Sequence, residues 1–250
     1  MAGHSKWANI KHKKAAADAK RGKVFSKIVK KIASAARRGG GDIDANPELR
    51  LYVDKARAVN MPNDNIERAI LKATGQLEGV SFEEFSYEGY GPGGVAILLE
   101  GSTDNRNRTV SEIRHAFSKH GGNMGENGCV SWMFDTRGIF VISTDEVEDP
   151  DELMLAAADA GAEDFELEED AVTITTEPGD FIQVRKGLEE FGITDFITDE
   201  ITKLPQNTLT LTGKDAETAI KLIDFFEDYD DIESVYSNLD IDDETAEAMG

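Results

Sequence analysis

The sequence predicts an α+β protein with an N-terminal helical domain and two ferredoxin-like α+β sandwich domains, one of them inserted into the other. Hydrophobic residues recur at helical spacing between Val24 and Ala73, and from Phe82 onward they alternate with the period of two that is typical of strands. Residues 137–203 then follow the order strand, helix, strand, strand, helix, strand, which is that of a ferredoxin-like domain.

The N-terminal domain is expected to hold three helices. Apolar residues at helical spacing over residues 24–36 predict the first helix, and the glycine run at 39–41 ends it. The Asn-Pro pair at 46–47 predicts the start of the second helix, because proline at the first helical position needs no amide hydrogen. The Met-Pro pair at 61–62 ends that helix, and Asn63 is expected to cap the third.

The rest of the chain is expected to form two α+β domains. Strands are predicted at 84–90, 94–101, 129–134, 137–143, 164–169, 171–176, 195–203, 207–212 and 232–237, and helices at 104–119, 150–160, 179–191 and 214–229. Segments 94–134 and 207–237 each have the order strand, helix, strand, and together they can form a second α+β domain. The simplest arrangement therefore inserts the ferredoxin-like domain, residues 137–203, between these two halves. The expected units are 1–80 (basic arm and helical domain), 81–135 plus 204–240 (discontinuous domain), 136–203 (inserted domain) and 241–250 (acidic tail).

Charge is distributed unevenly along the chain, whose formal net charge is −22. Residues 1–75 carry seventeen lysines and arginines against seven acids, whereas residues 76–250 carry ten against forty-two. The first 38 residues hold twelve of these cations and a single acid, Asp18. Such a local excess of positive charge on an acidic protein predicts a binding surface for a polyanion, and nucleic acid fits best.

The first twenty residues contain few large apolar side chains, so we expect a mobile basic arm. Its cations would neutralise phosphates, and Trp7 would stack on an unpaired base. The predicted nucleic-acid-binding residues are Lys6, Trp7, Lys11, His12, Lys13, Lys14, Lys20, Arg21, Lys23, Lys27, Lys30 and Lys31. Few Asn or Gln side chains accompany them, which favours binding without sequence specificity. A solvated tail and a membrane-surface segment are the weaker alternatives for this arm.

No motif predicts a catalytic residue, a cofactor or a metal site. The segment 89–94 contains G-x-G-x-x-G, but a dinucleotide loop places these glycines before a helix, whereas here a strand follows. We therefore expect a hairpin turn. No histidine or cysteine pair has the spacing usual for zinc.

Other features bear on the compartment. Cys129 is the single cysteine, which excludes an internal disulfide, fits a reducing compartment and predicts a buried thiol on a strand. The sequence shows no signal-peptide stretch and no apolar run of transmembrane length. We expect a soluble, cytoplasmic protein without a membrane partner.

Two arginines, Arg106 and Arg108, lie where a predicted strand leads into a helix in the acidic half of the chain. Planar guanidinium groups suit phosphate or carboxylate, so contact with an anionic ligand and a structural role in capping and ion pairs are equally supported. The first alternative would allow an enzyme acting on a small anionic substrate, although no other motif indicates catalysis.

The chain resembles the YebC/PmpR family over essentially its whole length. The resemblance rests on the opening segment 1–7 (MAGHSKW), on 18–23 (DAKRGK), 39–42 (GGGD), 60–62 (NMP), 66–70 (IERAI), 87–94 (YEGYGPGG) and 104–109 (DNRNRT). It implies a helical domain followed by two α+β domains, the last inserted in the second. Members are generally described as cytoplasmic transcriptional regulators that bind DNA.

Relatives of that family, including a mitochondrial translational activator of cytochrome c oxidase subunit I, are linked to translation and to relief of ribosome stalling. The resemblance therefore implies a non-enzymatic nucleic-acid-binding regulator, with promoter DNA as the first expected partner and ribosomal RNA as the alternative. The residues of the basic arm themselves slightly favour RNA, because a lysine-rich segment with Trp7 lacks an evident recognition helix, whereas the description of the family favours DNA.

Overall fold

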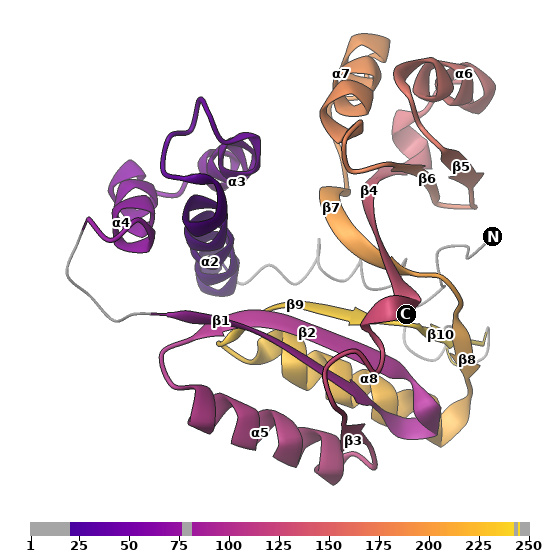
Figure 1. The fold of residues 1–250 in the computed structure, drawn as a ribbon. Coiled ribbons are helices and arrows are strands. Elements are labelled where there is room, and N and C mark those ends of the chain that lie inside the picture. Colours follow the sequence, from indigo (N-terminus) through magenta and orange to yellow (C-terminus); the bar gives the residue numbers. More distant parts are fainter. Residues whose placement is uncertain (1–20, 77–81, 243–244, 246–250) are drawn as a thin grey trace.

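The computed structural model describes residues 21–76, 82–242 and 245, with side chains from residue 25 onward. The α+β fold class is confirmed, with helices first and two sheet-containing domains after them (Figure 1). We call these the helical domain (21–76), the central domain (strands β1–β3 and β8–β10 with helices α5 and α8) and the inserted domain (β4–β7 with α6 and α7). The helical and inserted domains stand over one face of the central sheet, while α5 and α8 cover its other face (Figure 1).

The helical domain consists of α2 (Arg21–Gly39), α3 (Pro47–Ala58) and α4 (Asn63–Ala73), as predicted. The Asn46 side chain caps α3 by accepting a hydrogen bond from the Leu49 amide at 3.1 Å. The capping role predicted for Asn63 is wrong, because Asn63 is the first helical residue and Pro62 precedes it without a side-chain cap. The core of this domain contains Ile32, Leu49 and Val53, all fully buried.

The inserted domain has the predicted ferredoxin-like order. Its elements are β4 (Phe134–Ser143), α6 (Pro150–Ala160), β5 (Asp164–Leu167), β6 (Ala171–Thr176), α7 (Phe181–Phe191) and β7 (Thr198–Pro205). The sheet is antiparallel in the order β5-β6-β4-β7, so β7 is an edge strand. Both helices pack on one face around the stacked rings of Phe140 and Phe181, whose centroids are 4.6 Å apart.

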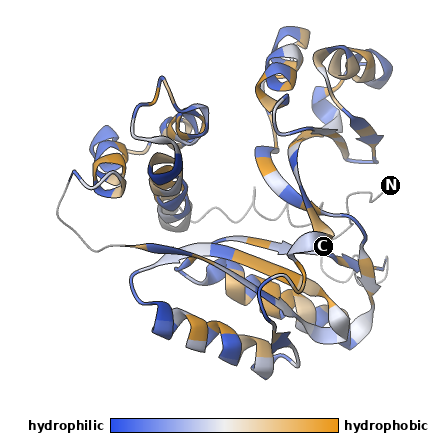
Figure 2. Cartoon of the chain, in the orientation of Figure 1, coloured by the Kyte–Doolittle hydropathy of each residue, from blue (hydrophilic) through white to orange (hydrophobic). Residues whose placement is uncertain are grey.

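The central domain is assembled from segments on either side of the insertion. It contains β1 (Glu83–Tyr90), β2 (Ala96–Thr103), α5 (Arg106–Lys119), β3 (Asn123–Met124), β8 (Leu209–Leu211), α8 (Gly213–Asp228), β9 (Ile232–Ser237) and β10 (Leu239–Ile241). The main sheet has the order β3-β1-β2-β9, and β8 pairs in parallel with β10, a strand the sequence pattern did not predict. Hydrophobic residues mark β2 and the facing helix α8 in Figure 2. Leu99 of β2 and Leu222 of α8 are fully buried.

The glycine-rich segment forms the expected turn. A short 3-10 turn, Pro92–Gly94, joins the antiparallel strands β1 and β2. Gly93 has a φ of 66°, and a Cβ atom there would lie 2.6 Å from the Leu211 side chain, so glycine is required for both conformation and space. This motif therefore forms a hairpin turn and not a dinucleotide-binding loop.

The predicted strand at 129–134 is wrong. Residues 125–130 form a loop, Ser131–Met133 a 3-10 turn, and β4 begins only at Phe134. The cause is Glu88 on β1, whose carboxylate accepts hydrogen bonds from the amides of Gly128, Val130 and Ser131 at 2.7–2.8 Å. Main-chain amides that donate to a side chain are not available to pair with a neighbouring strand. Cys129 is therefore a half-buried loop residue, and the prediction of a buried thiol on a strand is wrong.

Within the described ranges, no helix is long and apolar enough to span a membrane. In the same ranges, no group of three or more His, Cys, Asp or Glu side chains is arranged to hold a metal ion.

Candidate nucleic-acid interface

Helix α2 is the main described part of the predicted interface. Its nineteen residues include seven lysines and arginines and no acid. Ile32, Ala35 and Ala36 face α3 and α4 in the core, and the cations occupy the remaining faces. The helix therefore has one apolar side and a strongly positive remainder.

The structure describes only part of the predicted site. Seven of the predicted residues lie outside the described residues, namely Lys6, Trp7, Lys11, His12, Lys13, Lys14 and Lys20. Arg21 and Lys23 are in the first turns of α2, but their side chains lie outside the description as well. Lys27 is exposed, whereas Lys30 and Lys31 are partly buried between domains.

Lys31 is held by the inserted domain. Its Nζ lies 3.2 Å from Glu200 Oε2 on β7 and 5.4 Å from the centroid of the Tyr52 ring. Burial alone would lower the pKa of Lys31, but the Glu200 and Tyr52 interactions outweigh burial and raise the pKa above its usual value. Lys31 is thus a fixed positive charge that already has a carboxylate partner.

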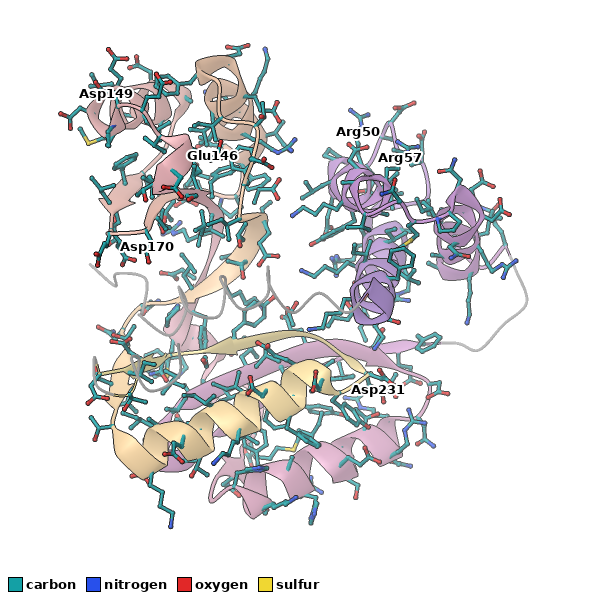
Figure 3. The ribbon with its side chains drawn as sticks, turned by 180° about the vertical axis from the view of Figure 1, so that it is seen from behind. Arg50, Arg57, Glu146, Asp149, Asp170 and Asp231 are labelled. Carbon is teal, nitrogen blue, oxygen red and sulfur yellow. The ribbon has the colours of Figure 1, made fainter. Side chains whose placement is uncertain are left out.

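Lys30, at the neighbouring position, is partly buried near carboxylates of the central domain. Burial lowers the pKa of Lys30, and the nearby carboxylates of Asp231, Glu233 and Asp230 offset only part of this effect. Figure 3 labels Asp231 at the end of the central sheet nearest the helical domain. Two adjacent lysines of α2 therefore face acids from two different domains.

Sequence reasoning missed several cations that make similar contacts. Lys55 on α3 lies 2.9 Å (Nζ) from Asp199 Oδ1 on β7, and it also donates to the Asp199 main-chain carbonyl. At the end of α2, Arg37 Nε lies 3.5 Å from Glu84 Oε1 on β1, and Arg38 pairs with Glu48. No local pattern marks these contacts, because each interdomain partner is distant in sequence.

Other cations of the helical domain point outward. Figure 3 labels Arg50 and Arg57 on α3, on the side away from the central sheet. Arg50 pairs with Asp44 at 3.1 Å and Arg57 with Asp54 at 3.4 Å, and all these side chains are at least half exposed. Exposed pairs of this kind exchange readily with solvent ions, so both arginines remain accessible to a polyanion.

A cavity of about 540 Å³ lies where the three domains meet. Lys31, Arg38 and Tyr52 line it from the helical domain, Ile201 and Lys203 from β7, and Glu84, Glu100 and Tyr236 from the central sheet are among the others. Lys203 pairs with Glu100, and the Tyr236 hydroxyl donates to the same carboxylate at 3.2 Å. The junction is thus hollow and polar, and its cations are matched by carboxylates.

Arg108 has a structural role in the central domain. Its Nη2 lies 2.9 Å from Asp104 Oδ1 and 2.9 Å from Asp231 Oδ2, and the Thr109 hydroxyl lies 2.7 Å from the same Asp231 oxygen. Asn105 caps α5 through its side chain, and Arg106 is exposed at the first position of that helix. Carboxylates already occupy the Arg108 guanidinium, which favours the structural alternative for this residue.

Two exposed aromatic side chains, Trp132 and Tyr90, contact the loop held by Glu88. Trp132 is 66% exposed, and its Nε1 donates to the Cys129 carbonyl at 3.2 Å. The Tyr90 hydroxyl donates to the same carbonyl at 2.9 Å. The sequence pattern did not predict this arrangement, because it depends on a carboxylate about forty residues earlier in the chain.

Comparison with known proteins identifies the family. The model of the TACO1/YebC protein N-terminal domain matches residues 5–76, and that of the TACO1/YebC second and third domain matches residues 82–239. The chain belongs to the TACO1/YebC family. The resemblance found in the sequence motifs is confirmed.

Full-length relatives carry the same description. A TACO1/YebC relative from Halothermothrix orenii is 59% identical over 100% of this chain and 99% of its own length, and one from Geobacter sulfurreducens is 57% identical over 100% of both. Each is named a probable transcriptional regulatory protein. The crystal structure of a conserved hypothetical protein from Aquifex aeolicus has 44% identity and a TM-score of 0.80, covering 90% of this chain and 93% of that one.

Proposed function

We propose that this protein is a non-enzymatic regulator that binds DNA through its N-terminal arm and helix α2. The observation that carries the proposal is the charge of α2, which has seven cations and no acid and directly follows the lysine-rich first twenty residues. The description of its relatives as probable transcriptional regulatory proteins supports the same function.

The residues suit contact with the phosphate backbone. Lysines and arginines of the arm and of α2 release condensed counterions when they neutralise phosphates, so affinity should fall steeply with salt. Trp7 would stack on an unpaired base, and His12 lies among lysines where a phosphate would approach. The acidic central and inserted domains would face away from the nucleic acid, because their charge repels it.

We expect the salt dependence of DNA binding to show whether the lysines of the arm contact phosphates. Replacing Lys11, Lys13 and Lys14 with Gln should reduce the slope of log Kd against log salt by about three for a duplex DNA probe, because each phosphate contact contributes about one. Fluorescence anisotropy over a range of salt concentrations measures this slope. The matched control replaces Lys186, Lys214 and Lys221 with Gln, which removes the same charge from the acidic domains. Equal slopes for the wild type and the arm variant would show that the arm is a solvated tail.

Ribosomal RNA is the second candidate partner. Trp7 in a lysine-rich segment suits unpaired bases, which are exposed in folded RNA more than in duplex DNA. Sedimentation of lysate through sucrose gradients at low and high salt separates the two partners. Salt-sensitive migration with ribosomes would favour translation, whereas its absence together with specific promoter footprints would favour transcription.

A further inference from the structure

Two consecutive acids of the inserted domain bind lysines of the helical domain. Glu200 contacts Lys31 on α2 at 3.2 Å, and Asp199 contacts Lys55 on α3 at 2.9 Å. The four side chains retain between 16% and 30% of their exposure, so they are half-buried but reachable by solvent. Both acids belong to β7, the edge strand of its sheet, which turns toward the helical domain.

This contact between domains depends mainly on charge. The helical and inserted domains have separate apolar cores, and in the described chain Leu51 of α3 is the helical-domain side chain that packs against the core of the inserted domain. Beside the ion pairs lies the hollow polar junction, with its volume of about 540 Å³. An interface with little apolar packing is readily opened, and competing ions weaken the charge pairs that hold it.

The bound lysines belong to the face that a polyanion would use. Lys31 is one of the seven cations of α2, and Lys55 extends the same positive surface onto α3. A carboxylate oxygen beside a lysine ammonium reproduces the contact that a phosphate oxygen would make. In the arrangement seen here, Asp199 and Glu200 therefore stand where phosphate oxygens would contact these two lysines.

We propose that Asp199 and Glu200 compete with nucleic-acid phosphates for Lys55 and Lys31, so that the closed arrangement of the helical and inserted domains is autoinhibited. This inference rests on the proposed function and adds its regulation. Binding of a polyanion displaces the two acids and separates the inserted domain from the helical domain. Affinity is reduced in the closed state, because breaking the two ion pairs opposes binding.

Neutralising the two acids tests the proposal. The full chain carrying Asp199→Asn and Glu200→Gln should bind a labelled 30-base-pair DNA duplex and a labelled ribosomal RNA fragment about fivefold to tenfold more tightly than wild type, as expected from the two pairs between the domains. The variant also removes the pair of Asp199 with Arg185 (Nε to Oδ2, 3.1 Å), which lies within the inserted domain and therefore does not hold the two domains together. Small-angle scattering without nucleic acid should show a larger radius of gyration for this variant. Added salt should expand the wild type in the same way.

The matched control is Asp151→Asn with Glu152→Gln, which removes two consecutive charges from exposed positions on α6 of the same domain. Asp149, just before them, lies on the side of the inserted domain away from the helical domain in Figure 3. A control effect below twofold supports a specific contact, while equal gains in both variants would reduce the effect to overall charge and overturn the proposal. If wild type binds and the β7 variant binds no better, only the autoinhibition fails. If neither protein binds either probe at low salt, the proposed function fails with it.

Discussion

Replacing Glu88 with alanine should lower the free energy of unfolding of the central domain by about 2–4 kcal/mol, because buried amides would lose their acceptor. The carboxylate accepts from Gly128, Val130 and Ser131 at 2.7–2.8 Å, and Val130 is fully buried. No neighbouring strand can replace these hydrogen bonds, since the loop does not pair with a sheet. The loss should exceed that of any exposed acid on the same strand.

Urea unfolding followed by tryptophan fluorescence measures this loss. Trp132 lies in the 3-10 turn directly after the affected loop and donates to the loop carbonyl of Cys129. Replacing Trp7, the other tryptophan of the chain, with Phe makes the signal specific to this region. Glu83→Ala, at the exposed first residue of β1, is the matched control and should change stability by less than about 0.5 kcal/mol. Similar losses in both variants would show that the loop does not depend on Glu88.

The Glu88 carboxylate should also make the free energy of unfolding fall at acid pH. Burial alone would raise the pKa of Glu88, but the three amide hydrogen bonds outweigh it and hold the pKa below the usual value. The stabilisation is therefore fully present above the unfolded pKa, about 4.3, and is lost as the pH falls through the lower folded pKa. Glu88→Gln should flatten this acid limb of the stability curve, whereas an unchanged limb would assign it to other acids.

Replacing Asp231 with alanine should destabilise the central domain by about 3 kcal/mol, because one buried oxygen serves several donors. Asp231 Oδ2 accepts from Thr103 at 3.1 Å, Thr109 at 2.7 Å and Arg108 at 2.9 Å. Both threonines are buried and would keep polar hydroxyl groups with fewer partners. The network ties the end of β2 and the start of α5 to β9, across the insertion.

Two comparisons make the Asp231 experiment specific. Asp230→Ala, at the exposed neighbouring position, should have an effect below about 0.5 kcal/mol in the same urea measurement. A double-mutant cycle with Arg108→Gln should show a coupling energy of about 1 kcal/mol, since the two residues share one interaction. Absence of coupling, together with weaker nucleic-acid binding by the Arg108 variant, would instead assign Arg108 to a ligand.

Periodicity and short turn signals were enough to predict most of this fold. The three helices, the ferredoxin-like order and the glycine-rich hairpin each follow from neighbouring residues, such as the cap made by Asn46. The loop after β3 was mispredicted because Glu88, some forty residues away, takes its amides. An apolar run such as Cys129–Phe134 has the composition of a strand, and only the distant carboxylate decides otherwise.

The positive charge of helix α2 could be predicted from the sequence, but the contacts of its lysines could not. The density of cations in α2 is visible in the sequence, so Lys30 and Lys31 were recognised as part of a positive surface. The carboxylate partner of Lys31 is 169 residues away along the chain, and the sequence contains 49 acids from which to choose. Only the folded arrangement shows that Glu200 faces Lys31 and that Lys55, outside the basic start, belongs to the same surface.

The two chain connections between the inserted domain and the central domain lie side by side. The Met133 carbonyl accepts a hydrogen bond from the Gln206 amide at 2.8 Å, and Phe134 pairs with Pro205 immediately beyond. The points at which the chain leaves and re-enters the central domain are therefore joined by a hydrogen bond. A turn of about two residues could connect them directly in place of the inserted domain. We expect such an architecture to be modular, so that the insertion could be excised or exchanged while the sheet that receives it keeps its register.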